Sequence, residues 1–286
     1  MNAIGIDVGG TKCLGVLIDE GANILCSVRK PTPSTEDLID LLQEIVEELG
    51  DASTIGVGLP GLITPRGVMQ AAPNLKNVVQ LSVATELEKR CGRKVHVEND
   101  ATSATYAEWK IGAARDATDA AFVGLGTGIG AGFVVGGRLQ RGAHGYAGEI
   151  GHMVVQVDGI ECVCGLRGCW ERYASGWALG NFAGGVDGEI VARRAAAGDA
   201  NMIEVVDVFA KWVALGLANL ANIIDPEVIV IGGGVVESSA VFMPAVQKWF
   251  AELLYSAESR THPRLESAQL GERAGAIGAA LLGATI

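Results

Sequence analysis

The stretch IGIDVGGTKCLGVLID, residues 4–19, joins two short apolar runs through a turn of small residues. The first run, residues 3–8, has the composition of a buried β-strand, and Gly9 and Gly10 permit a tight turn after it. Residues 11–19 then form a returning strand, and the polar residues 20–23 form the next turn. The stretch therefore predicts a β-hairpin that carries an acid, Asp7, beside a glycine turn.

A second stretch with the same layout lies at residues 123–137, VGLGTGIGAGFVVGG. It also places glycine and threonine between two apolar runs, and another hairpin turn follows. The repetition indicates two related domains, although hairpins also recur by chance. Strand and helix signals alternate in the rest of the chain and predict an α/β protein. One of these signals is an amphipathic helix over residues 34–50, with Ser34 and Asp37 as its capping signal.

The polar segment IGAARDATD, residues 111–119, marks the expected boundary between the domains. We expect a smaller N-terminal α/β domain over residues 1–114, joined by a C-terminal helix over residues 273–286. A larger C-terminal α/β domain then covers residues 115–272.

The composition excludes several classes of partner. The chain of 286 residues has a net charge of −11 and no basic stripe, which disfavours nucleic-acid binding. Residues 120–137 form a long uncharged run, but glycines alternate from Gly124 to Gly132, which is typical of a strand and not of a membrane helix. Asp7 interrupts the first apolar run, which disfavours a secretory signal. We expect a soluble cytoplasmic protein with no nucleic-acid or membrane partner.

Three glycine-rich turns are candidates for binding phosphate through backbone N–H groups. They are DVGGTK (7–12), GLGTGIG (124–130) and IGGG (231–234). Each alone is explained as well by an ordinary tight turn, whereas three of them together with an acid favour a nucleotide site. The sequence has no Walker A pattern. GVGLPG at 56–61 matches a dinucleotide-binding pattern, but Pro60 and Pro65 prevent the helix that such a site needs.

Several polar residues, most of them acidic, can have either a structural or a functional role. Asn99 and Asp100 lie where a predicted strand meets a predicted helix, and both residue types are favoured as helix caps for backbone reasons alone. A carboxylate at the end of a strand is also well placed to accept a proton from a substrate hydroxyl. Glu149 and Glu171 are either solvated surface charges or acceptors for the adjacent hydroxyls of a sugar.

Three of the six cysteines lie within residues 162–169, and His152 precedes them by ten residues. A disulfide would leave an odd cysteine and is disfavoured in a reducing compartment. A redox site would be expected to contain C-x-x-C, which this segment lacks. One histidine with three cysteines is a set that structural zinc prefers, although the C-x-C step is tighter than in most zinc knuckles. The spacing alone therefore favours zinc without deciding it.

Taken together, these stretches resemble the ROK family of repressors and sugar kinases, within the actin–hexokinase–Hsp70 ATPase superfamily. The resemblance extends over essentially the whole chain. It implies an actin-like ATPase (ribonuclease H-like) duplicated fold, in which two domains surround a central cleft that binds a sugar and ATP. The stretches that carry it are residues 4–19, GVGLPGLI (56–63), VENDATSAT (97–105), 123–137, GEIGH (148–152), CVCGLRGCWE (162–171) and VIVIGGG (228–234).

The resemblance also implies roles for individual residues. Asp100 is the implied general base, and Asp7 is implied to hold Mg²⁺ through water. Sugar contacts are implied at Gly61, Asn99, Asp100, Glu149, His152 and Glu171. ATP contacts are implied at Asp7, Gly9, Gly10, Thr11, Lys12, Gly126, Thr127, Gly128, Gly232, Gly233 and Gly234. A structural Zn²⁺ is implied in the segment 152–169, on His152, Cys162, Cys164 and Cys169, where it would order the loop that carries Glu171.

The implied reaction is ATP-dependent phosphorylation of the 6-hydroxyl of a hexose. The zinc segment, APNL (72–75) and GCWERYASG (168–176) look most like the glucokinases of the family, so D-glucose is the expected substrate. N-acetylmannosamine kinase or another hexose kinase of the family is the alternative. A sugar-responsive repressor would carry a helix-turn-helix domain before the first phosphate motif, for which the sequence leaves no room. The family also favours homodimers and homotetramers.

Overall fold

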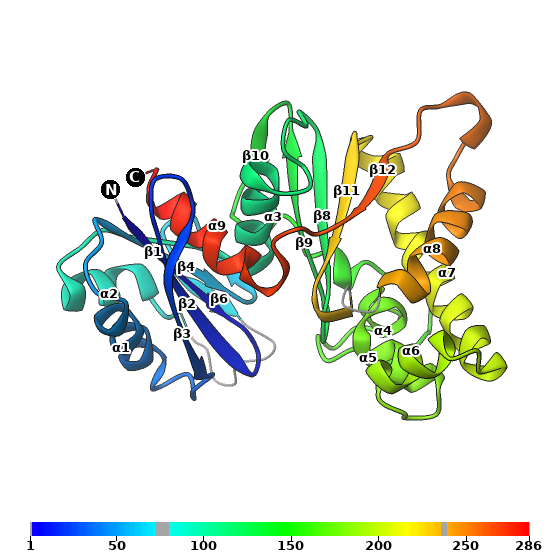
Figure 1. Cartoon of the computed structure of the whole chain (residues 1–286), viewed down its shortest axis with the longest axis horizontal. Coiled ribbons are helices and arrows are strands. Elements are labelled where there is room, and N and C mark those ends of the chain that lie inside the picture. Colours follow the sequence, from blue (N-terminus) through cyan, green and yellow to red (C-terminus); the bar gives the residue numbers. More distant parts are fainter. Residues whose placement is uncertain (1, 72–79, 236–238, 286) are drawn as a thin grey trace. The chain divides into compact units, whose positions relative to one another are not determined.

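Figure 1 shows a computed structural model of the chain, which describes residues 2–71, 80–235 and 239–285. The motif APNL, residues 72–75, lies outside the described residues. The chain divides into two compact units. The first unit comprises Met1–Arg115, Leu139–Gly148 and Leu270–Ile286, and the second unit comprises Asp116–Arg138 and Glu149–Gln269.

The first unit is built on a five-stranded sheet with the order β3-β2-β1-β4-β7. β1 and β2 form the hairpin that the opening stretch predicts, and β4 runs parallel to β1 and to β7. A short two-stranded sheet, β5-β6, follows β4. The elements of this unit are β1 (Ala3–Val8), β2 (Lys12–Ile18), β3 (Ile24–Pro31), α1 (Leu38–Leu49), β4 (Thr54–Leu59), β5 (Leu62–Ile63), β6 (Met69–Ala71), α2 (Val83–Cys91), β7 (Val95–Asn99), α3 (Asp100–Ile111), a 3₁₀ turn (Gly271–Arg273) and α9 (Ala274–Gly283).

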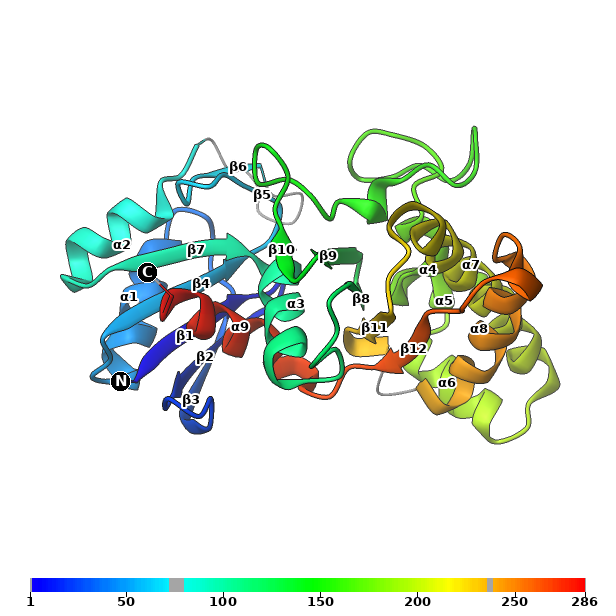
Figure 2. The same cartoon turned by 90° about the horizontal axis from the view of Figure 1, so that it is seen from above.

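The alternation of side chains along β1 directs them to two different layers. Ile4 and Ile6 belong to a core that includes residues of α1 and α2, whereas α9 packs on the opposite face of the sheet together with α3 (Figures 1 and 2). The approach of α9 is close. A Cβ on Gly5 would lie 1.9 Å from the carbonyl oxygen of Ala276, and a Cβ on Gly56 would lie 1.7 Å from that of Ala279. Glycine at these two strand positions therefore lets the C-terminal helix lie directly on the sheet.

The second unit has a five-stranded sheet with the order β10-β9-β8-β11-β12. Residues of β8 and β11 share one core with α7 and α8, which cover a face of this sheet (Figure 1). Its elements are β8 (Ala120–Leu125), β9 (Ile129–Val135), β10 (Arg138–Gln140), a 3₁₀ turn (Ile150–His152), α4 (Glu171–Ala174), α5 (Gly176–Phe182), α6 (Gly188–Ala196), α7 (Ala200–Ile224), β11 (Val228–Gly232), α8 (Ser239–Leu253), a 3₁₀ turn (Ala257–Ser259) and β12 (Arg264–Ser267).

The two sheets repeat one arrangement of strands. In each sheet an antiparallel hairpin, β1–β2 or β8–β9, is followed on one side by two strands parallel to its first strand. The α/β class predicted from the sequence is therefore confirmed, and the order of strands supports the duplication that the two glycine-rich hairpins indicate. None of the described helices is long and apolar enough to cross a lipid bilayer.

The start of α1 differs from the prediction. The helix begins at Leu38 and not at residue 34, and the side chain of its N-cap residue, Asp37, makes no capping hydrogen bond. Instead Asp37 accepts a hydrogen bond of 2.7 Å from the Ser34 hydroxyl. The interpretation of these two residues as a capping box was therefore wrong: Asp37 occupies the N-cap position, but its side chain bonds to Ser34 and not to the backbone of the helix.

The course of the chain also adds a segment to the first unit. The sequence predicts a boundary at residues 114–115, and the structure has a division after Arg115. Residues 139–148 belong to the first unit as well, which the sequence gives no reason to expect. Arg141 in this segment donates a hydrogen bond of 2.5 Å to Glu98, which is only 4% exposed. A buried carboxylate in the first unit thus holds the segment in place.

Candidate functional site

The carboxyl ends of β1, β4 and β7 meet at one edge of the first sheet, which is where ligands commonly bind in parallel sheets. Asp7 lies near the end of β1, and Asp100 directly follows β7. Gly58, the partner of Asp7 in the sheet, separates them. A Cβ on Gly58 would lie 3.4 Å from Asp100 Cα and 3.5 Å from Asp7 Oδ1. Two acids that are far apart in the sequence are therefore neighbours at this edge.

Asn99 joins two of the segments at the same edge. It is the N-cap residue of α3, where its side chain accepts a hydrogen bond of 3.0 Å from Thr102 N. Its amide nitrogen donates to the carbonyl oxygen of Gly61 at 3.2 Å. Gly61 has a φ of +89°, which favours glycine. The capping role of Asn99 is thus confirmed, and the sugar contacts implied for Asn99 and Gly61 stay predictions.

The first glycine turn, Gly9 to Lys12, also lies at this edge. It closes through a hydrogen bond of 2.9 Å from Gly9 N to Lys12 O, and the Thr32 hydroxyl donates to Gly9 O at 2.6 Å. Gly10 and Thr11 are exposed. Lys12, one of the implied ATP contacts, instead forms an exposed ion pair with Glu272 at 2.6 Å. Its implied contact with ATP would compete with this pair, which the sequence did not predict.

The carboxyl group of Asp7 is in an environment that favours its neutral form. Burial raises the pKa of Asp7 from 3.8 to about 8, and the negative charge of Asp100 contributes to the increase, while Lys12 acts against it. A carboxyl group with this property in a site with a second acid is typical of a cation-binding or acid–base position. A bound cation would favour the ionised form of both acids.

Replacing Asp7 with asparagine is expected to stabilise the metal-free protein at neutral pH. Because the pKa of Asp7 is about 8 in the folded state and 3.8 ordinarily, the stability of the wild-type protein falls as the pH rises between these values. Asparagine has a similar shape and no charge to bury. In thermal melts without divalent metal, Asp7→Asn should raise Tm by ~3 °C or more at pH 8, and the gain should shrink toward pH 4.

Asp19→Asn is the matched control for this experiment. Hydrogen bonds from Asn23 lower the pKa of Asp19, which lies in a turn of the same unit. The ionised carboxylate of Asp19 stabilises the folded protein above the ordinary pKa of an aspartate, and this effect is lost at low pH. The control variant should therefore show no gain in Tm at pH 8. A Tm of Asp7→Asn at or below the wild-type value at pH 8 would contradict the raised pKa.

In the second unit, the carboxyl ends of the parallel strands β8 and β11 place two glycine turns side by side. Gly126 N donates to Gly128 O at 3.0 Å, which closes the turn after β8. A Cβ on Gly233 would lie 2.3 Å from the carbonyl oxygen of Leu125, so the turn after β11 packs against the end of β8. The structure therefore brings together the implied ATP contacts of this unit, which are Gly126, Thr127, Gly128, Gly232, Gly233 and Gly234.

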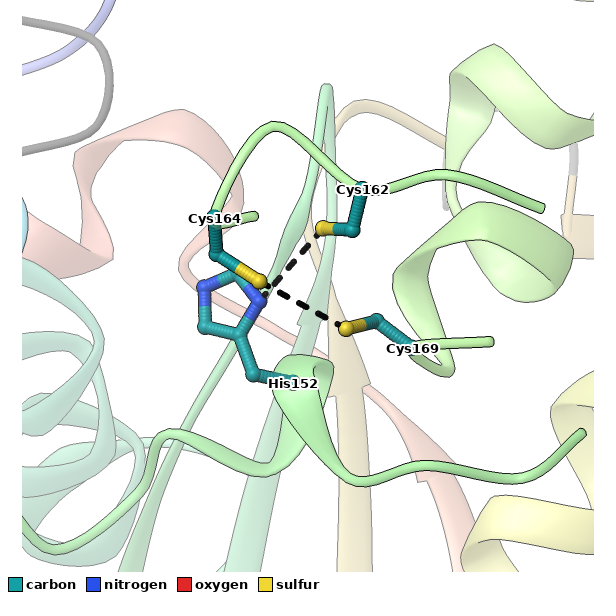
Figure 3. A group of neighbouring side chains, drawn as sticks. All are labelled: His152, Cys162, Cys164 and Cys169. Carbon is teal, nitrogen blue, oxygen red and sulfur yellow. Dashed lines mark hydrogen bonds between the residues drawn. The ribbon is translucent and has the colours of Figure 1, made fainter. Parts of the chain in front are cut away.

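His152 and the three clustered cysteines converge on one point, as Figure 3 shows. One possible ligand atom from each residue lies within 4.8 Å of the others. Cys164 Sγ and Cys169 Sγ are 3.6 Å apart, and Cys162 Sγ is 3.8 Å from His152 Nδ1. All three thiols are free, so the disulfide interpretation is excluded for this structure.

These separations fit a tetrahedral metal site. With zinc–sulfur bonds of about 2.3 Å, the sulfur atoms of a tetrahedron lie about 3.8 Å apart, and sulfur and nitrogen ligands are slightly closer. In the metal-free protein, burial raises the pKa of Cys162, and the nearby carboxylate of Glu171 raises it further. A divalent cation would offset both effects, because thiolates bind it in the deprotonated form. The donor set and its spacing therefore fit Zn²⁺.

Glycines shape the loop that presents the cysteines. Gly165 and Gly168 have φ values of +91° and +77°, and a Cβ on Gly168 would lie 1.7 Å from the carbonyl oxygen of Gln156. Trp170, which follows the last cysteine, is fully buried and donates to Trp212 O at 2.7 Å. The C-G-x-x-G-C-W sequence thus fixes one end of the cysteine loop on α7.

The two glutamates implied to bind sugar lie beside the His–Cys cluster. Glu171 Oε1 is 3.0 Å from Cys162 Sγ and 3.8 Å from His152 Nδ1, and a Cβ on Gly128 would lie 2.6 Å from Glu171 Oε2. Glu171 therefore separates the cluster from the glycine turn. Burial raises the pKa of Glu149, and the charge of Glu171 contributes to the increase while His152 opposes it. Since His152 directs Nδ1 at the cluster, Nε2 is the nitrogen left for a substrate hydroxyl.

Glu98 is a residue of this region that the sequence analysis missed. Its buried carboxylate accepts hydrogen bonds from Arg141 and, at 3.2 Å, from the backbone N–H of Asn99. It thereby holds the residue that precedes Asp100. Nothing in the spacing of the sequence links Glu98 to Arg141, and a carboxylate between the valines of β7 and Asn99 was the single available signal.

Comparison with known proteins agrees with this arrangement. A glucokinase of Streptomyces coelicolor is 33% identical over 304 residues, which cover 97% of this chain and 96% of the relative. The xylose repressor of Bacillus subtilis is 29% identical over 96% of this chain and 75% of its own length. The crystal structure of a ROK family glucokinase from Streptomyces griseus in complex with glucose and AMPPNP has a TM-score of 0.93, with 34% identity and full coverage of both chains.

The family to which the chain belongs follows from a match to a sequence model of a protein family. This sequence model describes the ROK family, and the match covers residues 3–285. The resemblance to the family and the actin-like fold that it implies are both confirmed by this match and by the similarity in structure. The chain belongs to the ROK family.

Proposed function

We propose that the protein transfers the γ-phosphoryl group of ATP to the 6-hydroxyl of a hexose, with D-glucose as the preferred substrate. The observation that carries this proposal is the pair of neighbouring acids, Asp7 and Asp100, at the carboxyl edge of the first sheet. The kinship with a glucokinase over nearly the whole of both chains supports the choice of reaction and of sugar.

Asp100 is the general base in the proposed reaction. Its carboxylate accepts the proton of the 6-hydroxyl while that oxygen forms a bond to the γ-phosphorus and the bond from phosphorus to the bridging oxygen of ADP breaks. The position of Asp100 in the first turn of α3, next to the N-cap Asn99, fixes the carboxylate relative to the sheet. Asp7 would hold Mg²⁺ through water, and this ion, when bound, neutralises charge on the phosphates.

The phosphates would be bound by backbone N–H groups in the turns Gly9–Thr11 and Gly126–Gly128. Such groups bind anions without a basic side chain, which suits a chain with a net charge of −11. Asn99, Glu149, His152 and Glu171 would bind the hydroxyls of the sugar, with Gly61 supporting Asn99. A Zn²⁺ on the His–Cys cluster would fix the loop that carries Glu171, so that the metal has a structural role and acts on the sugar through its neighbours.

A panel of hexoses tests the proposed function directly. ADP release is measured with ATP, Mg²⁺ and D-glucose, D-mannose, N-acetyl-D-mannosamine or N-acetyl-D-glucosamine, and glucose 6-phosphate is assayed with its dehydrogenase. We expect turnover that depends on sugar, with the highest kcat/KM for D-glucose and a product that the dehydrogenase oxidises. A preference for N-acetyl-D-mannosamine would support the alternative kinase, whereas ATP hydrolysis that is independent of sugar would contradict a sugar kinase of any specificity.

A further inference from the structure

An exposed tryptophan, Trp177, lies with a guanidinium group against its ring. Trp177 is the second residue of α5 and is 39% exposed. Arg172, in the short helix α4, places its guanidinium carbon 3.5 Å from the centre of the indole ring. This is the distance of a cation–π pair, in which the guanidinium group lies against one face of a partly exposed ring.

The guanidinium group of Arg172 lies over the indole ring with one of its N–H groups unpaired in the described part of the chain. The Nε atom of Arg172 is buried and has no hydrogen-bond partner among the described residues. An arginine that lies over an indole with its buried Nε unpaired acts as a support for the ring. Arg172 also directly follows Glu171, so the support is anchored at the end of the cysteine loop.

The backbone next to Trp177 contacts both glycine turns of the second unit. Gly176 N donates a hydrogen bond of 2.8 Å to Gly126 O, in the turn after β8. A Cβ on Gly176 would lie 3.2 Å from that same oxygen and 3.3 Å from the side chain of Val235, which follows the glycines after β11. Trp177 is therefore one residue away from the point where the two proposed nucleotide-binding turns meet.

We propose that Trp177, supported by Arg172, stacks on the base of the nucleotide that donates the phosphoryl group. This inference rests on the proposed function in one respect, the use of ATP. Trp177 selects a donor that carries a base over a donor that is phosphate alone, because a planar aromatic ring is required to complete the stack. Arg172 is a positioning residue, since it acts on the base through the indole.

Binding of ADP separates this role from catalysis. Calorimetry with ADP and Mg²⁺ should show that Trp177→Ala raises Kd by about ten-fold or more, as expected for the loss of one base–aromatic stack. Trp177→Phe, which keeps an aromatic face, should recover most of the affinity. Arg172→Lys, which keeps the charge and loses the planar group, should have an intermediate effect. The Kd for D-glucose should stay within two-fold of the wild-type value in the Trp177 variants.

Tripolyphosphate serves as a probe that has the phosphates of a nucleotide and no base. The affinity of tripolyphosphate, measured by binding or by inhibition of the protein, should be the same for wild type and Trp177→Ala. An equal loss of tripolyphosphate and ADP would overturn the proposal, because the ring would then support the glycine turns and not a base. A loss of glucose affinity with normal ADP affinity would also overturn it, because the ring would then belong to the sugar site.

Tryptophan fluorescence gives an independent measurement. ADP should quench the emission of the wild-type protein, and this quenching should be lost in Trp177→Phe. Trp249→Phe is the matched control: Trp249 also stacks with a cation, Lys211, at 4.4 Å, but it lies on α8 and donates to Asp207. Quenching that is unchanged in Trp177→Phe would overturn the stack.

The two proposals fail in different ways. A protein that binds ADP through Trp177 and shows no sugar-dependent turnover would refute the kinase and retain the stack. Normal sugar kinase activity with an unchanged ADP affinity in Trp177→Ala would refute the stack and retain the kinase. Absence of ADP binding in the wild-type protein would refute both.

Discussion

Asp100→Asn is expected to lower kcat by roughly 10²–10⁴-fold, which is the usual contribution of a general base. Asparagine has nearly the same size as aspartate and cannot accept the proton of the 6-hydroxyl. The variant should fold normally, since the cap of α3 is provided by Asn99, whose side chain accepts the hydrogen bond from Thr102 N. Affinity for D-glucose, measured by calorimetry, should therefore stay close to that of the wild-type protein while the coupled assay shows the loss of turnover.

Asp187→Asn provides the control for this variant. Asp187 is also an acid at the start of a helix, α6, and its carboxylate accepts a hydrogen bond of 2.9 Å from Glu189 N. Asparagine caps helices about as well as aspartate, so this variant should keep both its fold and its kcat. A folded Asp100→Asn protein with a kcat near the wild-type value would exclude Asp100 as the base.

Cys164→Ser is expected to remove zinc and sugar binding together. Cys164 is the exposed member of the cluster, so its replacement disturbs the apolar core less than a change at Cys162 or Cys169. Loss of one thiolate leaves an incomplete tetrahedral site. Without the metal, the loop that carries Glu171 loses its cross-link to His152 and is less firmly fixed, and weaker charged hydrogen bonds from Glu171 should raise the Kd for D-glucose by about ten-fold or more.

Elemental analysis together with separate titrations of D-glucose and ADP tests this expectation. The wild-type protein, purified without chelator, should contain one zinc per chain, and the affinity of Cys164→Ser for ADP should change much less than its affinity for glucose. Cys26→Ser is the control, because Cys26 is also exposed and lies outside the cluster. Zinc loss with normal glucose binding would show that the metal stabilises a loop unrelated to the substrate, and a wild-type protein without zinc would exclude the metal site.

The elements that the sequence predicts well are those with strong local signals. The C-terminal helix expected over residues 273–286 is α9, Ala274–Gly283, and the strand–helix junction predicted at Asn99 and Asp100 is where the structure has it. The His–Cys cluster follows from residue types whose chemistry leaves few alternatives, although its metal stays a prediction. Local patterns of this kind need no knowledge of the rest of the fold.

The features that the sequence does not reveal depend on contacts between distant segments. The pair of the buried Glu98 and the partly exposed Arg141 joins residues far apart in the chain, and the ion pair between Lys12 and Glu272 spans nearly its whole length. The position of Trp177 beside the glycine turns of the second unit becomes apparent from the contact of Gly176 with Gly126. Each of these contacts forms only in the tertiary structure. Ser34 and Asp37 show in addition that a local capping motif fails to predict the helix start when its polar side chains bond to each other.

The docking of α9 on the first sheet has a consequence for the order in which a newly made chain becomes active. A Cβ on Gly275, in the first turn of α9, would lie 2.6 Å from Cγ of Asp7, so the helix forms part of the surroundings of that acid. All residues proposed to bind sugar, nucleotide or metal are translated before this helix. A nascent chain therefore has every one of them while the layer behind Asp7 is still missing, and the second unit is complete in sequence before the first. Synthesis and docking of α9 is thus the step that completes the surroundings of Asp7, and the edge of the first sheet that carries this acid stays incomplete until residue 283 has been translated.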